Sequence, residues 1–437
     1  MRKMFSPVRR SLLLALLALA AAGTMLGGST AWARSFAYIC NSGSDDVTVI
    51  DVGTNQVVTT IPVGDCPQGV AIDPTGTRVY VSCYYGNNVY VIDTATNTVI
   101  ESFPGGGNSP LGIAVNPAGT RLYVVNQYSN KVTVIDTQTK DILAAISVKS
   151  SPCAVLVNPA GTRVYVSNSD NYVSVINADT NHIIKHIPVG VIPSGMAMNL
   201  SGTRIYVGDR QTNNVSVIRT GTNSVGRLIP VGTPCREVAV NSADNKLYVA
   251  GDTSNAVSIV NLLTDKIVDT ISPLSAPQGI ALNPTGTRAY AVNNGGNSVS
   301  VIDTRLREVV ATIPVGSSPV SLGQFITRSP EIRLDKKALD FGEVEIGLTS
   351  QPQTIVAANK GNLDLTIESI FLGGRNPKQF SQIHNCPSVL HPGDSCTITV
   401  TFHPVSLGTK NARVSIRTDD PDASQVNVPL TGVGGIQ

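Results

Sequence analysis

The sequence predicts an all-β chain, a seven-bladed β-propeller followed by an immunoglobulin-like β-sandwich. The first observation is a repeat, because the position of a Val-Ile-Asp triplet recurs at intervals of 41 to 43 residues. It falls at Asp51, Asp93, Asp136, Asn177, Arg219, Asn261 and Asp303. The second is that this period stops near Thr327, where short alternating strands take over. A period in the low forties with several strands per repeat is typical of a propeller with one blade per repeat.

Each repeat predicts four strands. In the repeat that begins at Gly112 we expect them at 112–115, 121–125, 131–136 and 142–148, with a tight Asn-Pro-Ala-Gly turn after the first. The first strand is almost continuously apolar, which favours a buried place near the axis. The fourth carries proline in five repeats, and proline belongs on an edge strand because it cannot donate to a sheet ladder. These prolines are Pro62, Pro104, Pro188, Pro230 and Pro314.

The two ends of the repeat array predict a closed ring. The first repeat lacks an innermost strand and begins directly at 37–40, whereas an extra segment at 317–325 follows the last repeat and aligns with the missing strand. We therefore expect residues 319–326 to pair into the first blade and the propeller to span 34–327. Closure of this kind removes the exposed sheet edge.

Seven tyrosines hold one place in the second strand of each repeat, and we interpret them as the packing layer between blades. They are Tyr38, Tyr80, Tyr123, Tyr165, Tyr206, Tyr248 and Tyr290. The segments YVVN at 123–126, YVSN at 165–168 and YAVN at 290–293 resemble the YVTN-type β-propeller repeat family over residues 36–326. That family includes extracytoplasmic and surface-layer-associated proteins, so the resemblance implies the fold more than an activity.

Residues 1–33 predict a secretory signal peptide. A basic start is followed by an apolar core at 12–22 and by Ala31-Trp32-Ala33, a small-x-small cleavage pattern. The alternative, a membrane anchor, is disfavoured by the shortness of the apolar run. We therefore expect an extracytoplasmic protein (secreted, periplasmic or on the cell surface) with no transmembrane segment in the mature chain.

The charge balance gives no sign of a nucleic-acid or membrane surface. Removal of 1–33 takes away four basic residues and no acid, so the formal net charge goes from +2 to −2. A chain this close to neutral lacks the basic surface that nucleic acids or anionic lipids require. We expect a monomer whose partner is a protein or a glycan.

Residues 328–437 predict a sandwich of seven or eight antiparallel strands. LDFGEVEIG at 339–347, the run at 395–421 and PLTGVG at 429–434 resemble the hydin-type immunoglobulin-like domain, found in bacteria in "choice-of-anchor D" exported proteins. This resemblance implies adhesion, spacing or assembly. Cys386 and Cys396 are expected to form a disulfide here, and Cys66 with Cys83 in the propeller is the best second pair.

One face of the propeller carries the variable connections, namely the loops between second and third strands and the crossings between blades. A ligand site is therefore expected at the mouth of the central channel on this face. A first group of candidates is aromatic: Tyr84, Tyr85, Tyr128 and Tyr172. Such tyrosines could bind a glycan or peptide, and the alternative is that they only cover loop backbone.

A second group of candidates is charged: Asp209, Arg210, Arg236, Glu237 and Asp252. The sixth inner strand replaces the usual Pro-x-Gly opening with Cys235-Arg236-Glu237. Charges beside a channel need pairing or a ligand to offset their desolvation, so the alternatives are a site or an internal Arg–Glu ion pair.

The favoured function is an exported cell-envelope or secreted scaffold that presents a propeller face to a protein or glycan, with the sandwich as spacer or attachment module. The alternative is a propeller enzyme of lactonase-like or quinone-dependent type that uses the charged group of blades five and six. The five histidines lie on an outer strand or in the tail, which argues against copper or haem chemistry. We expect no catalytic residues, no metal ligands and no cofactor, although scattered Asp and Asn oxygens leave calcium possible.

Overall fold

The computed structural model describes residues 35–436 apart from positions 242, 244, 328, 329, 331, 360, 362, 392, 421 and 422. The predicted signal peptide, residues 1–33, lies outside the described residues. The predicted boundary between the two domains, at 327 and 328, falls beside positions that are not described, so it stays a prediction.

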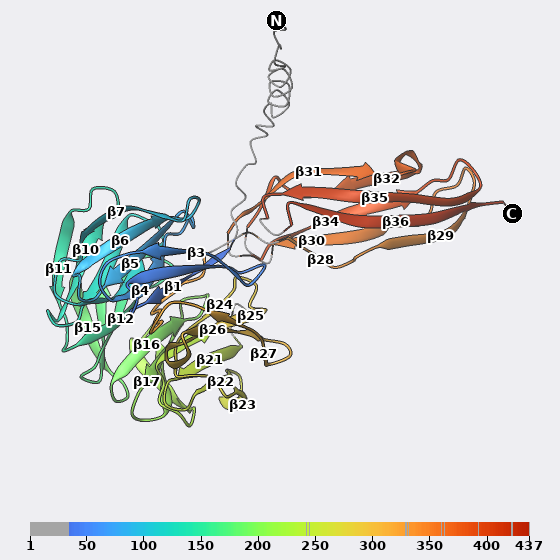
Figure 1. Ribbon diagram of the computed structural model, residues 1–437. Helices are drawn as coiled ribbons and strands as arrows, with labels where there is room; N and C mark the ends of the chain where they lie inside the picture. Colours follow the sequence, from blue (N-terminus) through green and yellow to red (C-terminus); the bar gives the residue numbers. More distant parts are fainter. Residues whose placement is uncertain are drawn as a thin grey trace, which may run out of the picture. The chain divides into compact units, whose positions relative to one another are not determined.

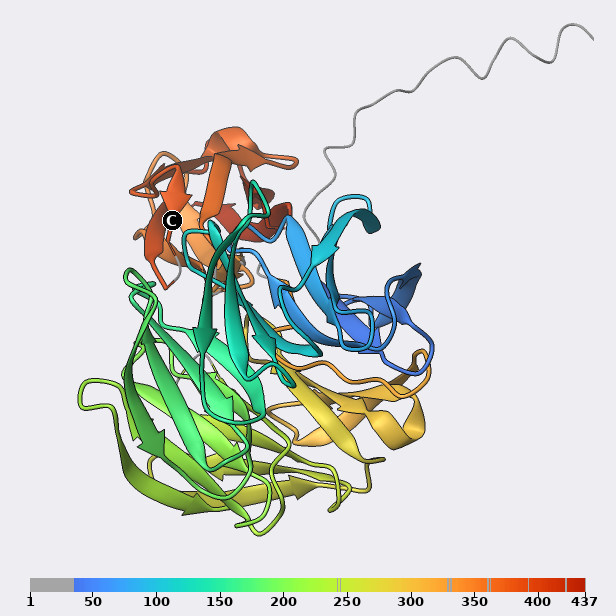
Figure 2. The ribbon, with the colours of Figure 1, turned by 90° about the vertical axis from the view of Figure 1, so that its left-hand side faces the viewer.

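Seven small sheets follow one another around a ring, which the colours trace from blue through green to gold in Figure 2. Six of them have four strands, and within each the chain runs from the inner to the outer strand. The inner strands are β4 (Pro67–Ile72), β8 (Pro110–Val115), β12 (Pro152–Val157), β16 (Pro193–Met198), β20 (Glu237–Val240) and β24 (Pro277–Leu282). The fold class predicted from the repeat is confirmed.

The second strands are β1 (Phe36–Asn41), β5 (Arg78–Cys83), β9 (Arg121–Asn126), β13 (Arg163–Asn168), β17 (Arg204–Asp209), β21 (Lys246–Gly251) and β25 (Arg288–Asn293). The third are β2 (Asp46–Asp51), β6 (Asn88–Asp93), β10 (Lys131–Asp136), β14 (Tyr172–Asn177), β18 (Asn214–Arg219), β22 (Ala256–Asn261) and β26 (Ser298–Asp303). The outer are β3 (Gln56–Pro62), β7 (Thr98–Pro104), β11 (Ile142–Ser147), β15 (His182–Pro188), β19 (Ser224–Pro230), β23 (Lys266–Ile271) and β27 (Glu308–Pro314). Figure 1 labels most of these strands.

The first sheet has only β1, β2 and β3, and the segment after the last repeat completes it. Isolated antiparallel bridges join Ala37 to Ile326 and Asn41 to Pro319. The N–H of Tyr38 donates to the carbonyl oxygen of Phe325, and the N–H of Val320 donates to that of Cys40, both at 2.8 Å. The same segment also bridges to blade two, where Leu322 lies parallel to Gly69. The last part of the propeller thereby closes onto its first strand.

The seven tyrosines of the second strands are among the largest fully buried side chains. Several of them reach into the next blade, as Tyr38 does when its hydroxyl donates to Asn97 at 2.6 Å and Tyr165 when it donates to Asn223 at 3.3 Å. Asn97 and Asn223 sit in the turns between third and outer strands with positive φ, a conformation that Asn tolerates better than most residues. The layer between blades is thus tied by hydrogen bonds as well as by packing.

A polar pair closes the end of the second and third strands in most blades. Asn126 donates to Thr133 at 2.9 Å, and Asn168 donates to Ser174 at 3.0 Å. The equivalent pairs in the first and last blades join Asn41 to Thr48 and Asn293 to Ser300. This buried Asn is the last residue of the repeated Tyr-Val-x-Asn segment, and its hydrogen bond to the third strand explains why it recurs.

The C-terminal residues form a sandwich of two sheets around one shared core. One sheet has the order β28 (Ile332–Leu334), β30 (Gln353–Asn359), β34 (Ser395–Phe402), β32 (Phe380–His384). The other has β29 (Leu339–Glu345), β36 (Gln425–Gly435), β35 (Gly408–Thr418), β31 (Leu365–Gly373), β33 (Val389–Leu390).

The described part of the sandwich differs from the prediction in two respects. It has nine strands instead of seven or eight, because Ile332–Leu334 and Val389–Leu390 add short edge strands. The pairing is also not wholly antiparallel, since β29 runs parallel to β36. The expected disulfide between Cys386 and Cys396 is present, with the two Cα atoms 4.8 Å apart.

Candidate functional site

A cavity of about 290 Å³ lies where the inner strands of blades two to six begin. We call it the mouth cavity, because the starts of these strands and the loops between second and third strands surround one end of the central axis. Its lining comprises Gln68, Tyr84, Tyr85, Leu111, Gln127, Cys153, Ser169, Ile192, Pro193, Ser194, Arg210 and Arg236. This is the face on which the sequence predicts a ligand site, and four of the predicted residues are among the lining.

Two positions of the repeat supply most of this lining. The residue after the opening proline of the inner strand lines the cavity in blades two to five: Gln68, Leu111, Cys153 and Ser194. The residue that directly follows each second strand does the same in blades two to five: Tyr84, Gln127, Ser169 and Arg210. The lining residues that are neither tyrosine nor charged were not among the predicted site residues, although their equivalent positions in the repeats could have identified them.

The aromatic side of the mouth cavity is a cluster of three tyrosines. Tyr84 is buried and packs edge-to-face on Tyr85, with ring centroids 5.1 Å apart, and on Tyr128, at 5.9 Å. Its hydroxyl donates to the side-chain oxygen of Gln127 at 2.7 Å, so the ring is held in place. Tyr85 and Tyr128 remain 65% and 71% exposed, which leaves ring faces open to a ligand.

Tyr172 does not join this cluster. It begins the third strand of blade four and pairs with Pro188 of the outer strand β15. Its ring is covered by the Lys149 ammonium, 4.9 Å from the ring centroid, and packs edge-on against His186 at 6.4 Å. The sequence interpretation that grouped Tyr172 with the loop tyrosines is wrong in this respect, because the residue sits inside a strand and not in the loop before it.

The charged candidates also divide into residues that line the mouth cavity and residues that do not. Arg210 donates to Asp252 at 3.1 Å and so joins blade five to blade six at the rim of the mouth cavity. The Asp252 side chain is the less accessible partner, and its second oxygen accepts from the N–H of Thr253 at 2.9 Å. Arg210 therefore reaches the cavity as one half of an ion pair.

Asp209 belongs to the fold and not to the cavity. It occupies the position of the motif asparagine in blade five, is fully buried, and accepts a hydrogen bond from Ser216 at 2.9 Å. Burial raises the pKa of this carboxyl to about 6, against the lowering effect of its hydrogen bonds to Ser216, Thr212 and Gly190. Its assignment as a ligand-binding residue is not supported by its position, which it shares with Asn126 and Asn168 in other blades.

Arg236 reaches the mouth cavity because the entry to blade six departs from the repeat. In the other entries a residue with positive φ precedes the proline, and its N–H donates to an Asn or Asp of the preceding blade, as Ser151 does to Asn130 at 2.8 Å. In blade six this position is Pro234, which has no N–H and a φ fixed near −65°. The inner strand is correspondingly short, starting only at Glu237, and Arg236 donates its backbone N–H to Ala250 at 2.9 Å.

The guanidinium of Arg236 is half-buried, and its Nε is buried without a hydrogen-bond partner among the described residues. The alternative drawn from the sequence, an ion pair between Arg236 and Glu237, is not present. Neighbouring residues in an extended chain point in opposite directions, and Glu237 lines a different cavity at the other end of the inner strands. The five charged candidates therefore do not form one group.

The cysteine pair Cys66–Cys83 predicted for the propeller does not form, and both thiols are free. Cys83 packs in the core between blades one and two with Cys40, whereas Cys66 packs beside Tyr84 and Cys153 at the axis. Their side chains thus point into different clusters, although Tyr84 donates its N–H to the carbonyl oxygen of Cys66 at 2.8 Å. Burial raises the pKa of the Cys83 thiol to about 12.

Within the part of the chain that the structure describes, no three His, Cys, Asp or Glu side chains are grouped so that they could hold a metal ion. No helix among the described residues is long and apolar enough to cross a membrane.

Two family models match the chain. Residues 35–163 match the YNCE-like beta-propeller, and residues 330–433 match the HYDIN/CFA65/VesB-like, Ig-like domain. The chain combines a β-propeller with an Ig-like domain. Both resemblances drawn from the sequence are thereby confirmed. No curated protein matches this propeller and Ig-like chain in sequence.

Solved structures share the fold of the chain. Hydrazine synthase of Kuenenia stuttgartiensis has a TM-score of 0.57 at 22% identity, over 61% of this chain and 92% of that one. A functionally unknown protein from Desulfotomaculum acetoxidans has a TM-score of 0.57 at 15% identity, over 66% and 99%. Dihydro-heme d1 dehydrogenase NirN in complex with DHE has a TM-score of 0.52 at 13% identity, over 75% and 69%. At these identities the likeness extends to the fold alone.

Proposed function

We propose that the protein is an exported binding and scaffold protein of the cell envelope or its surroundings. Its propeller presents the mouth cavity to a glycan or protein partner, and its Ig-like domain acts as a spacer or attachment module. The observation that carries the proposal is that one cavity is lined both by the exposed ring of Tyr85 and by Arg236, whose buried Nε has no hydrogen-bond partner among the described residues. The cavity is built from variable positions of an otherwise uniform repeat.

The chemistry of the lining favours an acidic partner. Among the lining residues the charged side chains are Arg210 and Arg236, and Arg210 is already paired with Asp252. The buried Nε of Arg236 lacks a partner among the described residues, so a ligand carboxylate or sulfate would satisfy it. The ring of Tyr85, which lines the same cavity as Arg236, and the ring of Tyr128, which packs on Tyr84, are both exposed and offer flat apolar faces to a ligand.

A glycan fits this combination better than an extended peptide does. Sugar rings pack on aromatic faces, and their hydroxyls match the amides and hydroxyls of Gln68, Gln127 and Ser169 in the lining. A volume of about 290 Å³ lies at the small end of ligand pockets, so the cavity would hold one or two sugar units of a longer chain. We therefore expect the partner to be a polysaccharide that carries uronate or sulfate groups.

A glycan array probed with the full purified protein tests this function. Acidic glycans should be retained over neutral ones of the same length, and retention should fall as salt is raised, because the arginine contact is screened. Arg236→Ala and Tyr85→Ala should each weaken the best hit at least tenfold. Tyr172→Ala is the matched control, since this tyrosine is covered by Lys149 outside the cavity.

Two results would overturn the proposal. The first is binding that is unchanged in Arg236→Ala and Tyr85→Ala but lost in Tyr172→Ala, which would move the site to the outer part of blade four. The second is that peptides and no glycan are retained, and that Arg236→Ala and Tyr85→Ala leave this retention unchanged, which would place the partner outside the mouth cavity.

A further inference from the structure

A second cavity, of about 350 Å³, lies at the opposite end of the inner strands, and we call it the apolar cavity. The inner strands of blades four to seven supply most of its lining, together with Gly323 and Gln324 of the closing segment. The apolar side chains include Leu156, Met196, Met198, Leu200, Ile280 and Leu282. Among the residues that line this cavity, Glu237 is the one with an acidic or basic side chain.

Glu237 stands where the other inner strands carry a small residue. The corresponding positions are Gly69, Gly112, Ala154, Gly195 and Gly279. The neighbouring blade makes room for the larger side chain, because a Cβ added to Gly195 would lie 2.1 Å from Oε1 of Glu237. The carboxyl group thus fills space that a glycine in the adjacent strand leaves open, which indicates that this exchange is accommodated by the fold.

The carboxyl group is poorly satisfied. Glu237 is 3% exposed, and its Oε1 accepts a hydrogen bond from the N–H of Val238 at 3.2 Å. Oε2 has no hydrogen-bond partner among the residues that the structure describes. Leaving a buried carboxyl oxygen without a partner destabilises a fold, and such groups concentrate at binding sites, where a ligand supplies what is missing.

We propose that the apolar cavity binds an amphiphilic amine, with its hydrocarbon body against the leucine and methionine side chains and its ammonium group donating to Glu237. An ammonium group is all donor and carries the charge opposite to a carboxylate. An anionic amphiphile would instead meet a carboxyl group with no basic side chain in the lining to balance it. The apolar cavity is a separate cavity from the mouth cavity, because it lies at the other end of the inner strands.

Charge and proton balance follow from the surroundings of Glu237. Burial raises the pKa of its carboxyl to about 8, while Arg236 and the nearby N–H groups of Val238 and Gly323 act in the opposite direction. Among the described residues, the Cys153 thiol of β12 also interacts with this carboxyl, and burial raises the pKa of the thiol. Near pH 7 the carboxyl therefore holds its proton, and binding of an ammonium ion displaces that proton into solvent.

Calorimetric titration of the full protein with n-hexylamine, n-hexanol and hexanoate tests the inference. Hexylamine should bind about tenfold more tightly at pH 9 than at pH 7, since the ionised fraction of a group of pKa about 8 rises about tenfold and the amine stays protonated. At pH 7 nearly one proton should be released per amine bound, measured from the dependence of the heat on the buffer. Hexanol should bind without pH dependence, and hexanoate more weakly than hexanol.

Glu237→Gln keeps the shape of the side chain and removes its charge. It should abolish the proton release and the pH dependence and weaken hexylamine binding at pH 9 at least tenfold, while hexanol binding persists. Glu308→Gln, the same exchange at an exposed position of the outer strand β27, should change none of these quantities. The inference is overturned by equal hexylamine binding in Glu237→Gln and the parent, by preference for hexanoate, or by no saturation with hexylamine at about 10 mM.

Discussion

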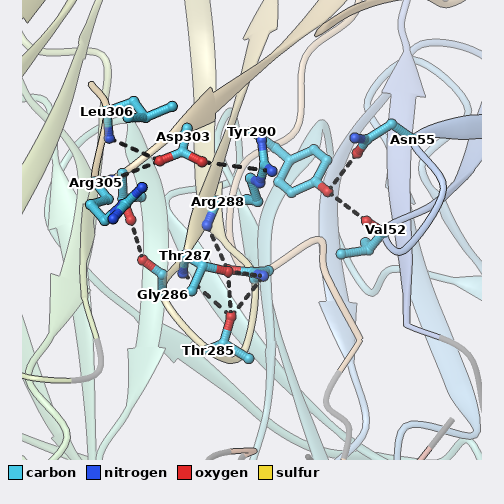
Figure 3. A network of polar contacts seen from close by, with 12 residues as sticks. Val52, Asn55, Thr285, Gly286, Thr287, Arg288, Tyr290, Asp303, Arg305 and Leu306 are labelled. Carbon is cyan, nitrogen blue, oxygen red and sulfur yellow. Dashed lines mark hydrogen bonds and ion pairs between the residues drawn. The ribbon is translucent and has the colours of Figure 1, made fainter. Parts of the chain in front are cut away.

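The hydroxyl of Tyr290 in the last blade donates to the side-chain oxygen of Asn55 in the first blade at 3.0 Å and to the carbonyl oxygen of Val52 at 3.1 Å (Figure 3). Asn55 has a φ of 57° in the turn between β2 and β3, so its side chain faces the incoming ring. The same hydrogen bond joins Tyr38 of blade one to Asn97 of blade two. The Tyr290–Asn55 bond is its equivalent at the seam, where the last blade meets the first. Residues 235 positions apart are therefore bonded as if their blades were neighbours in sequence.

Removing this hydroxyl should weaken the closed ring. We expect Tyr290→Phe to lower the free energy of unfolding by about 1 kcal/mol, because Asn55 loses a donor at a partly buried site. Urea unfolding of the full protein measures the change. Tyr123→Phe is the matched control, since the buried hydroxyl of Tyr123 has no hydrogen-bond partner among the described residues and its loss should be neutral or slightly stabilising. Equal losses in the two variants would contradict the importance of the seam bond.

The closing segment should contribute more through packing than through any single hydrogen bond. Phe325 is fully buried in the core that also holds Tyr38, Tyr290 and Val299 from the first and last blades. We expect Phe325→Ala to lower the free energy of unfolding by roughly 3–5 kcal/mol. Leu228→Ala, at an exposed position of the outer strand β19, should change it by less than about 0.5 kcal/mol. Thermal unfolding followed by circular dichroism would distinguish these values.

Pro234, which stands one residue before the position of the proline in the other blade entries, gives a prediction about binding. The double variant Pro234→Ser, Cys235→Pro places a proline one residue later, as in the other blade entries. Its new N–H at position 234 can donate a hydrogen bond to the side chain of Asn213, as the N–H of Ser151 does to Asn130. We expect the double variant to be as stable as the parent or more so, by up to about 1 kcal/mol. Its affinity for acidic glycans should fall at least tenfold, because the backbone that directs Arg236 into the mouth cavity is reset. Unchanged glycan affinity would show that Pro234 does not position this side chain.

Stability should fall as the pH rises. Glu237 holds its proton in the folded state up to a pKa of about 8, whereas the unfolded chain releases it near 4.5, so the folded state binds more protons between these values. The free energy of unfolding should decrease by on the order of 5 kcal/mol across this window, since each unit of difference between the two pKa values contributes about 1.4 kcal/mol. Glu237→Gln should remove most of the decrease. A smaller decrease below pH 6 should remain, because burial also raises the pKa of Asp209 to about 6.

The features that repeat in the chain were predictable, because seven copies of one pattern average out local exceptions. The blade count, the buried tyrosine layer and the pairing of residues 319–326 with β1 all follow from the alignment of the copies. The disulfide Cys386–Cys396 followed from its short spacing in a segment expected to lie outside the cytoplasm.

The site was harder to predict because it depends on the direction of single side chains. Tyr172 and Tyr128 look alike in sequence, yet the first lies inside a strand and the second in a loop. Arg236 and Glu237 are adjacent, and the extended backbone sends them to different cavities. Asp209 takes the structural place that asparagine holds in other blades and accepts a hydrogen bond from Ser216, a role that the sequence pattern does not distinguish from that of a site residue.

The order of synthesis adds a consequence to the way blade one is completed. The amino-terminal strand emerges first from the ribosome, whereas the segment that covers its inner edge lies almost 300 residues later, with Ala37 facing Ile326. Until then β1 offers unsatisfied backbone groups to any passing chain, which is the condition that favours aggregation. A nascent molecule of this protein is therefore most in need of a chaperone during the interval before its closing residues arrive, and truncation shortly before Pro319 should leave it trapped in that state.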